Sequence, residues 1–307
     1  MAHGHDHHGH EHRAASADYG RAFAAGIVLN LAYVAAEATL GVVAGSLALL
    51  ADAGHNLGDV LSLGLAWGAA WLGRRRPSQR FTYGLRSSSI LAALANAAIL
   101  LVVTGGIAWE AVLRLGRPVP VAGGLVAAIA AVGIVVNGGT ALLFARGRRR
   151  DLNIRSAFQH MTADALVTAG VVVAGIAVAL TGLAWIDPAV SLAVSAVIVY
   201  GTWGLLRDAV RLALDAVPEG IDTAAVRAHL AALPGVAALH DLHIWGMSTT
   251  ETALTCHLVM PGGHPGDAAL AALAHELEAR FGIHHATIQI EIGDSEEACA
   301  LTSEHAL

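Results

Sequence analysis

Six long apolar stretches dominate this 307-residue sequence and restrict what it can fold into. A helix needs about 20 mostly apolar residues to cross the hydrocarbon core of a bilayer. Stretches of this kind run roughly over residues 23–43, 47–72, 90–113, 124–144, 157–180 and 188–206. Only 14% of the residues are charged, whereas soluble domains carry about 25%. The sequence therefore predicts six transmembrane helices surrounded by lipid, and it argues against a soluble enzyme, a disordered chain and a nucleic-acid binder.

The arginine residues predict how these helices are oriented. Ten Arg lie in or beside the segments that follow the second and fourth stretches, and two more follow the sixth. The loops on the opposite side contain only Arg114 and Arg117. Positive residues accumulate on the cytoplasmic side of membrane proteins. We therefore expect a multi-pass protein of the cell (plasma or inner) membrane with both termini in the cytoplasm. Between the first two stretches, Ala44-Gly45-Ser46 leaves room only for a tight hairpin.

The composition changes after residue 206, because residues 207–307 contain 14 acidic residues and four Arg, a net charge of −10. Hydrophobic spacing predicts a helix, two strands, a helix and a strand over residues 221–233, 236–245, 251–260, 267–281 and 286–292. This order, α-β-β-α-β, indicates an α+β ferredoxin-like domain. We expect four parts: a His-rich tail (1–20), the helical domain (21–206), a cytoplasmic metal-binding and dimerisation domain (207–293) and an acidic tail (294–307).

Ionisable residues at bilayer depth are costly and so become candidates for function, and two of the predicted helices carry a His-Asp pair there. His55 and Asp59 are four residues apart, and His160 and Asp164 repeat that spacing in the fifth helix. On a helix, this spacing puts both members of a pair on one face. Two facing pairs would offer two imidazoles and two carboxylates, a set that suits tetrahedral Zn²⁺. A hydrogen-bonding cluster between helices is the alternative, which the repetition of the pair disfavours.

The ligand types rank the metals that such a site would take. Nitrogen and oxygen ligands favour Zn²⁺ and then Co²⁺, whereas Cd²⁺ prefers sulfur but remains a candidate minor substrate. Mg²⁺ and Ca²⁺ prefer shells made of oxygen alone. Asp52 lies on the same helix face as His55. It either orients a metal ligand or takes part in a helix contact, and the sequence does not separate these roles. Glu110, four residues before Arg114, is expected to form a plain ion pair.

These residues resemble the signatures of the cation diffusion facilitators, in the zinc-transporting branch of that family. The matching motifs are Asn30-Leu31, residues 51–60 (ADAGHNLGDV), 81–84 (FTYG), 160–165 (HMTADA), 240–245 (HDLHIW) and 287–291 (TIQIE). The resemblance implies a homodimer that exports divalent metal, most readily Zn²⁺, from the cytoplasm in exchange for protons by alternating access. One departure is visible. Where the family has an Arg-Ala-Glu run after Tyr-Gly, this chain has Leu85-Arg86-Ser87-Ser88-Ser89, so we expect no metal site in that loop.

The resemblance also implies a second, regulatory metal site in the cytoplasmic domain. Its expected ligands are His240, His257 and Glu291, each on a different predicted strand, with His275 on the second helix as a weaker fourth candidate. The alternative is that these His are solvated or merely hydrogen-bonded. His243 is three residues from His240, so on a regular strand the two would face opposite sides.

Two further features complete the sequence-based hypothesis. Six His within the first 12 residues predict weak metal binding by the tail. Cys256 and Cys299 are too few for a disulfide framework and are expected to stay reduced. We do not expect an enzyme, because no membrane segment carries the His-Glu-x-x-His motif of an intramembrane metalloprotease. A membrane-bound zinc sensor or scaffold that binds metal without transporting it is the main alternative to a transporter.

Overall fold

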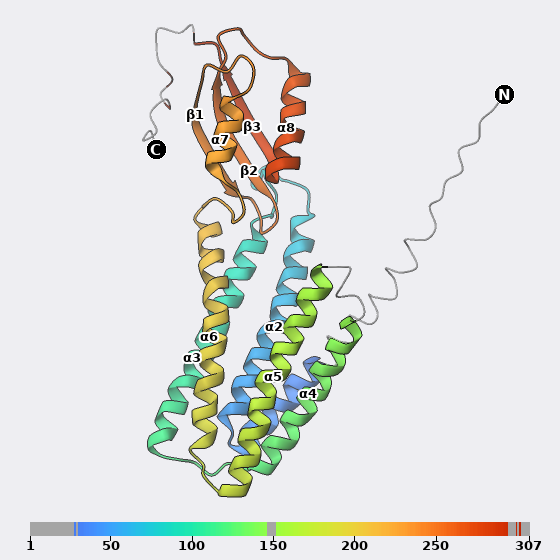
Figure 1. The fold of residues 1–307 in the computed structure, drawn as a ribbon, viewed down its shortest axis with the longest axis vertical. Helices are drawn as coiled ribbons and strands as arrows, with labels where there is room; N and C mark the ends of the chain where they lie inside the picture. Colours follow the sequence, from blue (N-terminus) through green and yellow to red (C-terminus); the bar gives the residue numbers. More distant parts are fainter. Residues whose placement is uncertain (1–27, 29, 146–151, 294–298, 300, 302–307) are drawn as a thin grey trace, which may run out of the picture. The chain divides into compact units, whose positions relative to one another are not determined.

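The computed structural model describes residues 28, 30–145, 152–293, 299 and 301, and it describes their side chains except at 63, 66, 70, 140–145 and 152–161. In this part of the chain, long helices precede a small α+β domain (Figure 1). The helices are Asn30–Ala44, α2 (Leu47–Gly73), α3 (Ser88–Gly116), α4 (Gly123–Ala145), α5 (Leu152–Thr181) and α6 (Ile186–Ala213). This order confirms the predicted six-helix class. The His-rich tail and most of the acidic tail lie outside the described residues.

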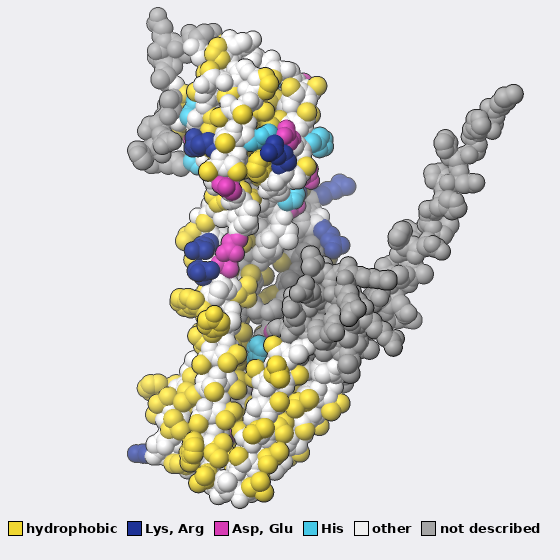
Figure 2. All heavy atoms as spheres, viewed as in Figure 1, with side chains coloured by type: hydrophobic (Ala, Val, Ile, Leu, Met, Phe, Trp, Pro, Cys, Tyr) yellow, Lys and Arg dark blue, Asp and Glu magenta, His cyan; other side chains and the backbone are white. Residues whose placement is uncertain are grey.

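The described helices have the length and surface of membrane-spanning segments. Three are long and apolar enough to cross a membrane, and two are shorter apolar helices: Ser88–Gly116, Thr162–Thr181 and Ile186–Ala213, then Asn30–Ala44 and Gly123–Gly139. Figure 2 shows apolar side chains spread over the outside of the helices, and Trp109, Val135 and Leu180 are among the exposed ones. An apolar surface this broad is unusual for a soluble monomer and fits contact with lipid.

The described chain gathers into two compact units. The first unit comprises the described residues of the ranges Met1–Leu63 and Ala98–Thr202, and the second comprises those of Gly64–Ala97 and Trp203–Leu307. The second unit therefore joins the ends of α2, α3 and α6 to the α+β domain. Helix α6 continues to Ala213, beyond the end of its apolar stretch at residue 206. Along this polar turn Asp208 forms ion pairs with Arg207 and Arg211.

The first unit confirms the tight hairpin between the first helix and α2. Gly45 has a φ of +67°, which a glycine adopts without steric cost. The backbone N–H of Ser46 donates to the carbonyl of Gly41 at 3.0 Å and so closes the first helix. The N–H of Leu49 donates to Ser46 Oγ at 3.1 Å, and the N–H of Leu47 donates to Asp187 Oδ2 at 2.7 Å. These acceptors satisfy N–H groups that a helix start leaves unpaired.

Helices α4 and α5 cross closely through two glycines. A Cβ added to Gly175 would lie 2.7 Å from the backbone nitrogen of Ala127, and one added to Gly123 would lie 2.5 Å from the carbonyl oxygen of Gly175. Real Cβ atoms do not approach other atoms so closely. Small residues let membrane helices approach in this way. The predicted ion pair on α3 is also confirmed, since Arg114 Nε donates to Glu110 Oε1 at 2.9 Å.

The α+β domain has the predicted element order: α7 (Thr223–Ala231), β1 (Ala238–Gly246), β2 (Thr252–Val259), α8 (Asp267–Phe281) and β3 (Ile283–Glu291). The strands form one sheet in the order β1-β2-β3, with β1 and β2 antiparallel and β2 and β3 parallel. Leu254, Cys256 and Leu258 of β2 pack with the buried residues of α7 and α8. The two helices therefore cover the face of the sheet to which these residues point.

Strand β1 contains a bulge that overturns one expectation. His240 pairs with His257 and His243 pairs with Thr255, and the register shifts between the two pairs. Residues 255 and 257 are two positions apart on β2 and share a face, so His240 and His243 also share a face. The prediction of opposite faces was wrong because a bulge inserts an extra residue and so reverses the alternation. Asp241 in the bulge has a φ of +51°.

The second unit also contains contacts between the α2–α3 connection and the turn from β1 to β2. Ser87 Oγ donates to the carbonyl of Met247 at 3.3 Å, and the N–H of Thr249 donates to Ser89 Oγ at 3.1 Å. An ion pair joins Arg86 and Glu251. The serine-rich run that departs from the family pattern therefore contacts the α+β domain.

Candidate metal sites

A cluster of potential metal ligands lies in the first unit, between α2 and α5. His55, Asp59 and Asp164 each offer one ligand atom, and these atoms all lie within 4.8 Å of one another. His55 Nε2 and Asp164 Oδ1 are 3.2 Å apart, and Asp164 is buried. The structure thus brings together three of the four residues predicted for this site. His160 lies in α5, one turn before Asp164, but its side chain is outside the described ones.

The arrangement has the chemistry of a divalent cation site. Two carboxylates and an imidazole converge from two helices within an apolar bundle. Carboxylates away from bulk water are unfavourable unless they are paired or coordinate a metal. Imidazole nitrogen and carboxylate oxygen are ligands that Zn²⁺ commonly binds in proteins.

Asp52 lies beside this cluster and is almost completely buried. Its Oδ2 is 2.9 Å from the hydroxyl of Thr168, and the same hydroxyl is 3.0 Å from the backbone carbonyl of Asp164. Asp52 therefore contacts α5 one turn beyond the candidate ligand. This contact joins the helices and reaches the Asp164 turn through its backbone, so it is compatible with both roles expected for Asp52.

A second buried carboxylate, Glu37 of the first helix, accompanies the site. Its two oxygens accept hydrogen bonds from the hydroxyl of Tyr33 at 2.7 Å and from Nδ2 of Asn56 at 3.3 Å. Tyr33 and Glu37 are four residues apart, a spacing that places both side chains on the same face of a helix.

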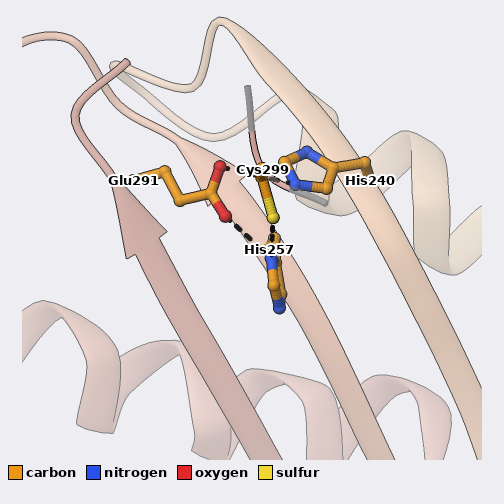
Figure 3. Close-up of side chains that lie close together, drawn as sticks. All are labelled: His240, His257, Glu291 and Cys299. Carbon is orange, nitrogen blue, oxygen red and sulfur yellow. Dashed lines mark hydrogen bonds and ion pairs between the residues drawn. The ribbon is translucent and has the colours of Figure 1, made fainter. Parts of the chain in front are cut away.

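The second candidate site lies in the α+β domain, on the sheet face opposite α7 and α8. Figure 3 shows side chains from all three strands, His240 of β1, His257 of β2 and Glu291 of β3, together with Cys299. Their ligand atoms lie within 4.8 Å of one another. His257 Nδ1 is 2.8 Å from Glu291 Oε1, and His240 Nε2 is 3.4 Å from Glu291 Oε2. The three strand residues are those that the family resemblance implied.

Comparison with known proteins supplies the family. Residues 23–212 match the cation efflux transmembrane domain, and residues 218–292 match the cation efflux protein cytoplasmic domain. The protein is a member of the cation diffusion facilitator family. This confirms the resemblance seen in the sequence, and it makes the chain a membrane transporter of metal cations rather than an enzyme. Both candidate clusters lie within the two matched regions.

Relatives of this cation diffusion facilitator match over most of its length. The cation efflux system protein CzcD of Alcaligenes sp. is 32% identical over 294 residues, which are 95% of this chain and 92% of CzcD. The zinc transporter ZitB of Escherichia coli is 36% identical over 261 residues, 84% of this chain and 83% of ZitB. The cadmium, cobalt and zinc/H⁺-K⁺ antiporter of Bacillus subtilis is 33% identical over 269 residues, 86% of each chain.

The electrostatics of the cytoplasmic cluster favour an ionised carboxylate. Burial opposes the ionisation of Glu291, but a hydrogen bond with Cys299, a hydrogen bond with His257 and the charge of the two His together lower its pKa below the ordinary value. The other thiol behaves differently. Cys256 points into the core under the helices, where burial raises its pKa to about 12. The alternation of strand residues thus puts an inert thiol next to a candidate metal ligand.

The structure corrects one expected member of this cluster and adds another. His275 is exposed on α8 and, among the described side chains, does not join the cluster. The reason is that α8 packs on the face of Cys256, whereas His257 points to the opposite face. Cys299, rather than His275, is the fourth member of the described cluster. Its only sequence signal was a single Cys in an acidic tail, eight residues after Glu291.

Proposed function

We propose that this protein exports Zn²⁺ from the cytoplasm in exchange for protons, using His55, Asp59, His160 and Asp164 to bind the metal in transit. The observation that carries the proposal is the convergence of His55, Asp59 and Asp164 from α2 and α5. Relatives named for zinc transport and for cadmium, cobalt and zinc antiport with H⁺ and K⁺ support it. Co²⁺ and Cd²⁺ are the proposed minor substrates.

The chemistry of the ligands couples metal to protons. A metal site needs neutral imidazole and ionised carboxylate, so metal binding releases protons and protonation expels the metal. Imidazole titrates near pH 6.5 in water, which keeps the exchange within reach of physiological pH. Alternating exposure of the site to the two sides of the membrane, through rocking of helices, would complete the cycle. The negative charges of Asp59 and Asp164 would favour cation binding whether the site is open to the cytoplasm or to the other side of the membrane.

The remaining parts of the proposal follow from the family and the charge pattern. The chain acts as a homodimer with both termini in the cytoplasm. The match to the dimer-domain family supports the first part, and the six predicted spans together with the Arg-rich loops support the second. His240, His257 and Glu291 hold a second, regulatory metal ion. The His-rich tail over residues 1–20 gathers metal weakly near the entrance.

Zinc-driven proton flux in proteoliposomes tests the proposal. Wild-type protein should transport protons in the direction opposite to zinc. Asp59→Ala or His160→Ala should abolish that flux while the protein still inserts into the membrane. Glu110→Gln, which alters an ion pair of α3 away from the site, is the control and should keep the flux. Normal flux in Asp59→Ala would refute the assignment of the site. Zinc binding without any flux in wild-type protein would instead favour the sensor.

A further inference from the structure

We propose that an arginine patch in the connection between α2 and α3 binds the headgroup of an anionic phospholipid. The patch consists of Arg74, Arg75, Arg76 and Arg80. The inference goes beyond the transport proposed above, because it gives a lipid partner to a surface that takes no part in binding Zn²⁺. With the orientation proposed above, the lipid belongs to the cytoplasmic leaflet.

The arginine patch carries positive charge that the chain itself does not neutralise. No Asp or Glu occurs between Asp59 and Glu110, so the connection has no acidic residue of its own. All four side chains of the patch are exposed, and none forms an ion pair with a described acidic residue. Arg86 in the same connection differs, because it pairs with Glu251. The counter-charges of the patch must therefore come from solvent or from another molecule.

The backbone around the patch is held by hydrogen bonds. The N–H of Arg75 donates to the carbonyl of Leu72 at 3.0 Å. The N–H of Ser78 donates to the carbonyl of Phe81 at 3.0 Å, and the N–H of Phe81 donates to Ser78 Oγ at 3.1 Å. Gly84, with a φ of +74°, lies against the carbonyl oxygen of Arg75, 3.3 Å from where a Cβ would be. A backbone fixed in this way loses less conformational freedom when a ligand binds.

The length of α2 places the patch at the level of lipid headgroups. The helix has 27 residues and ends at Gly73, directly before the patch. At 1.5 Å per residue it is about 40 Å long, whereas the hydrocarbon core of a bilayer is about 30 Å thick. A helix of this length that crosses the core ends among the headgroups, where lipid phosphates lie. This position favours a lipid over a nucleic acid or an acidic protein as the partner.

Two exposed tryptophans lie beside the patch and match the apolar part of a lipid. Trp67 and Trp71 are four residues apart on α2, so they share a helix face, and they are 75% and 53% exposed. Tryptophan is enriched where a membrane meets water. The guanidinium carbon of Arg75 lies 4.2 Å from the centroid of the Trp71 ring. This contact positions the cation without neutralising it, so apolar rings and positive charge adjoin as acyl chain and anionic headgroup do in a lipid.

The chemistry of the patch distinguishes between lipid classes. The planar guanidinium of Arg donates two parallel hydrogen bonds to a phosphate. Phosphatidylglycerol offers a phosphate and no cation. Phosphatidylcholine offers the same phosphate together with an ammonium group, which the patch would repel. The patch should therefore select phosphatidylglycerol over phosphatidylcholine.

Native mass spectrometry of the full-length protein in a nonionic detergent tests this selection, with phosphatidylglycerol and phosphatidylcholine of the same acyl chains as the probes. Wild-type protein should retain phosphatidylglycerol preferentially, and the preference should fall as salt is raised because the charges are exposed. Arg75→Gln combined with Arg76→Gln should lower the affinity for phosphatidylglycerol by about 5-fold for each Arg removed. This variant keeps Arg74 and Arg80, and with them much of the charge that orients the helices.

Two further variants locate the bound lipid. Arg207→Gln combined with Arg211→Gln removes the same charge from exposed arginines that already pair with Asp208, so it should keep the wild-type affinity. Brominated phosphatidylglycerol should quench the tryptophan fluorescence of wild-type protein more than brominated phosphatidylcholine does. Trp67→Phe combined with Trp71→Phe should reduce this difference.

Three results would overturn the proposal. Equal retention of the two lipids by wild-type protein would do so without depending on the folding of any variant. Displacement of phosphatidylglycerol by inorganic phosphate would assign the patch to free phosphate instead of a lipid. Equal loss of affinity in the two double Arg variants would mean that overall surface charge, rather than the patch, attracts the lipid. None of these measurements uses zinc flux, so each result leaves the proposed transport function standing.

Discussion

The guanidinium Nη1 of Arg86 lies 2.7 Å from Oε1 of Glu251 and joins the α2–α3 connection to the turn between β1 and β2. Arg86 is the second residue of the run that departs from the family pattern. The loss of a carboxylate there is accompanied by two hydrogen bonds, from Ser87 to Met247 and from Thr249 to Ser89. In this chain, the segment therefore makes polar contacts with the α+β domain.

We expect Arg86→Glu to lower the transport rate and the thermal stability, and Arg86→Glu with Glu251→Arg to restore part of both. Both side chains are partly exposed, at 41% and 35%, so the coupling energy should be about 0.2–1 kcal/mol. A double-mutant cycle on the unfolding midpoint and on zinc flux measures it. Arg80→Glu, the same charge change in the same connection, is the matched control. A charge swap that is as damaging as the two single changes added together would show that the pair is not coupled.

His55→Asp should change the metal selectivity of transport. The substitution replaces the nitrogen ligand of α2 with oxygen, so the rate for Zn²⁺ should fall relative to the rates for harder ions such as Mn²⁺. Flux across a panel of metals in proteoliposomes measures the change, with Glu110→Asp as the control. A selectivity that does not move would mean that the membrane His does not set it.

The sequence was sufficient for those features that depend on local periodicity. Apolar length predicted the helices, and the spacing of His55 and Asp59 put two ligands on one helix face. Alternation located the three strands, although β3 begins at Ile283 rather than at 286. The earlier start follows from Gly282, whose left-handed conformation ends α8 and leads directly into the strand.

Features that depend on contacts between distant segments could not be predicted from local residue spacing. The bulge at Asp241 places His243 on the same face of the sheet as His240. A period-two pattern of apolar residues does not predict where an extra residue is inserted into a strand. Cys299 joins its cluster from a position eight residues beyond Glu291, and no local spacing links it to the strand residues. The pairing of Arg86 with Glu251 likewise spans two domains of the sequence, and exposed charges carry no pattern that specifies a partner.

The crossing of α4 and α5 predicts a steric effect specific to one glycine. Gly175→Ala would force a methyl group to within 2.7 Å of the backbone of Ala127, so the helices must separate, at a cost of about 1–3 kcal/mol. Gly170→Ala in the same helix is the matched control, because the described residues place no heavy atom within 4 Å of its added Cβ. Thermal unfolding should separate the two variants. Equal midpoints would show that the crossing relaxes without loss.

The buried thiol of Cys256 predicts a decline in stability at alkaline pH. Its pKa is raised to about 12 in the folded protein by burial, whereas an unfolded Cys titrates near about 8.5. Between these values the folded state holds a proton that the unfolded state has lost, so this contribution is complete below about pH 8.5 and falls as the pH rises, by at most about 1.4 kcal/mol per unit. Urea unfolding at pH 8 to 10 should therefore show a steeper loss in wild-type protein than in Cys256→Ala, with Cys299→Ser retaining the wild-type slope. Identical slopes in wild-type and Cys256→Ala protein would mean that water reaches this thiol in the folded state.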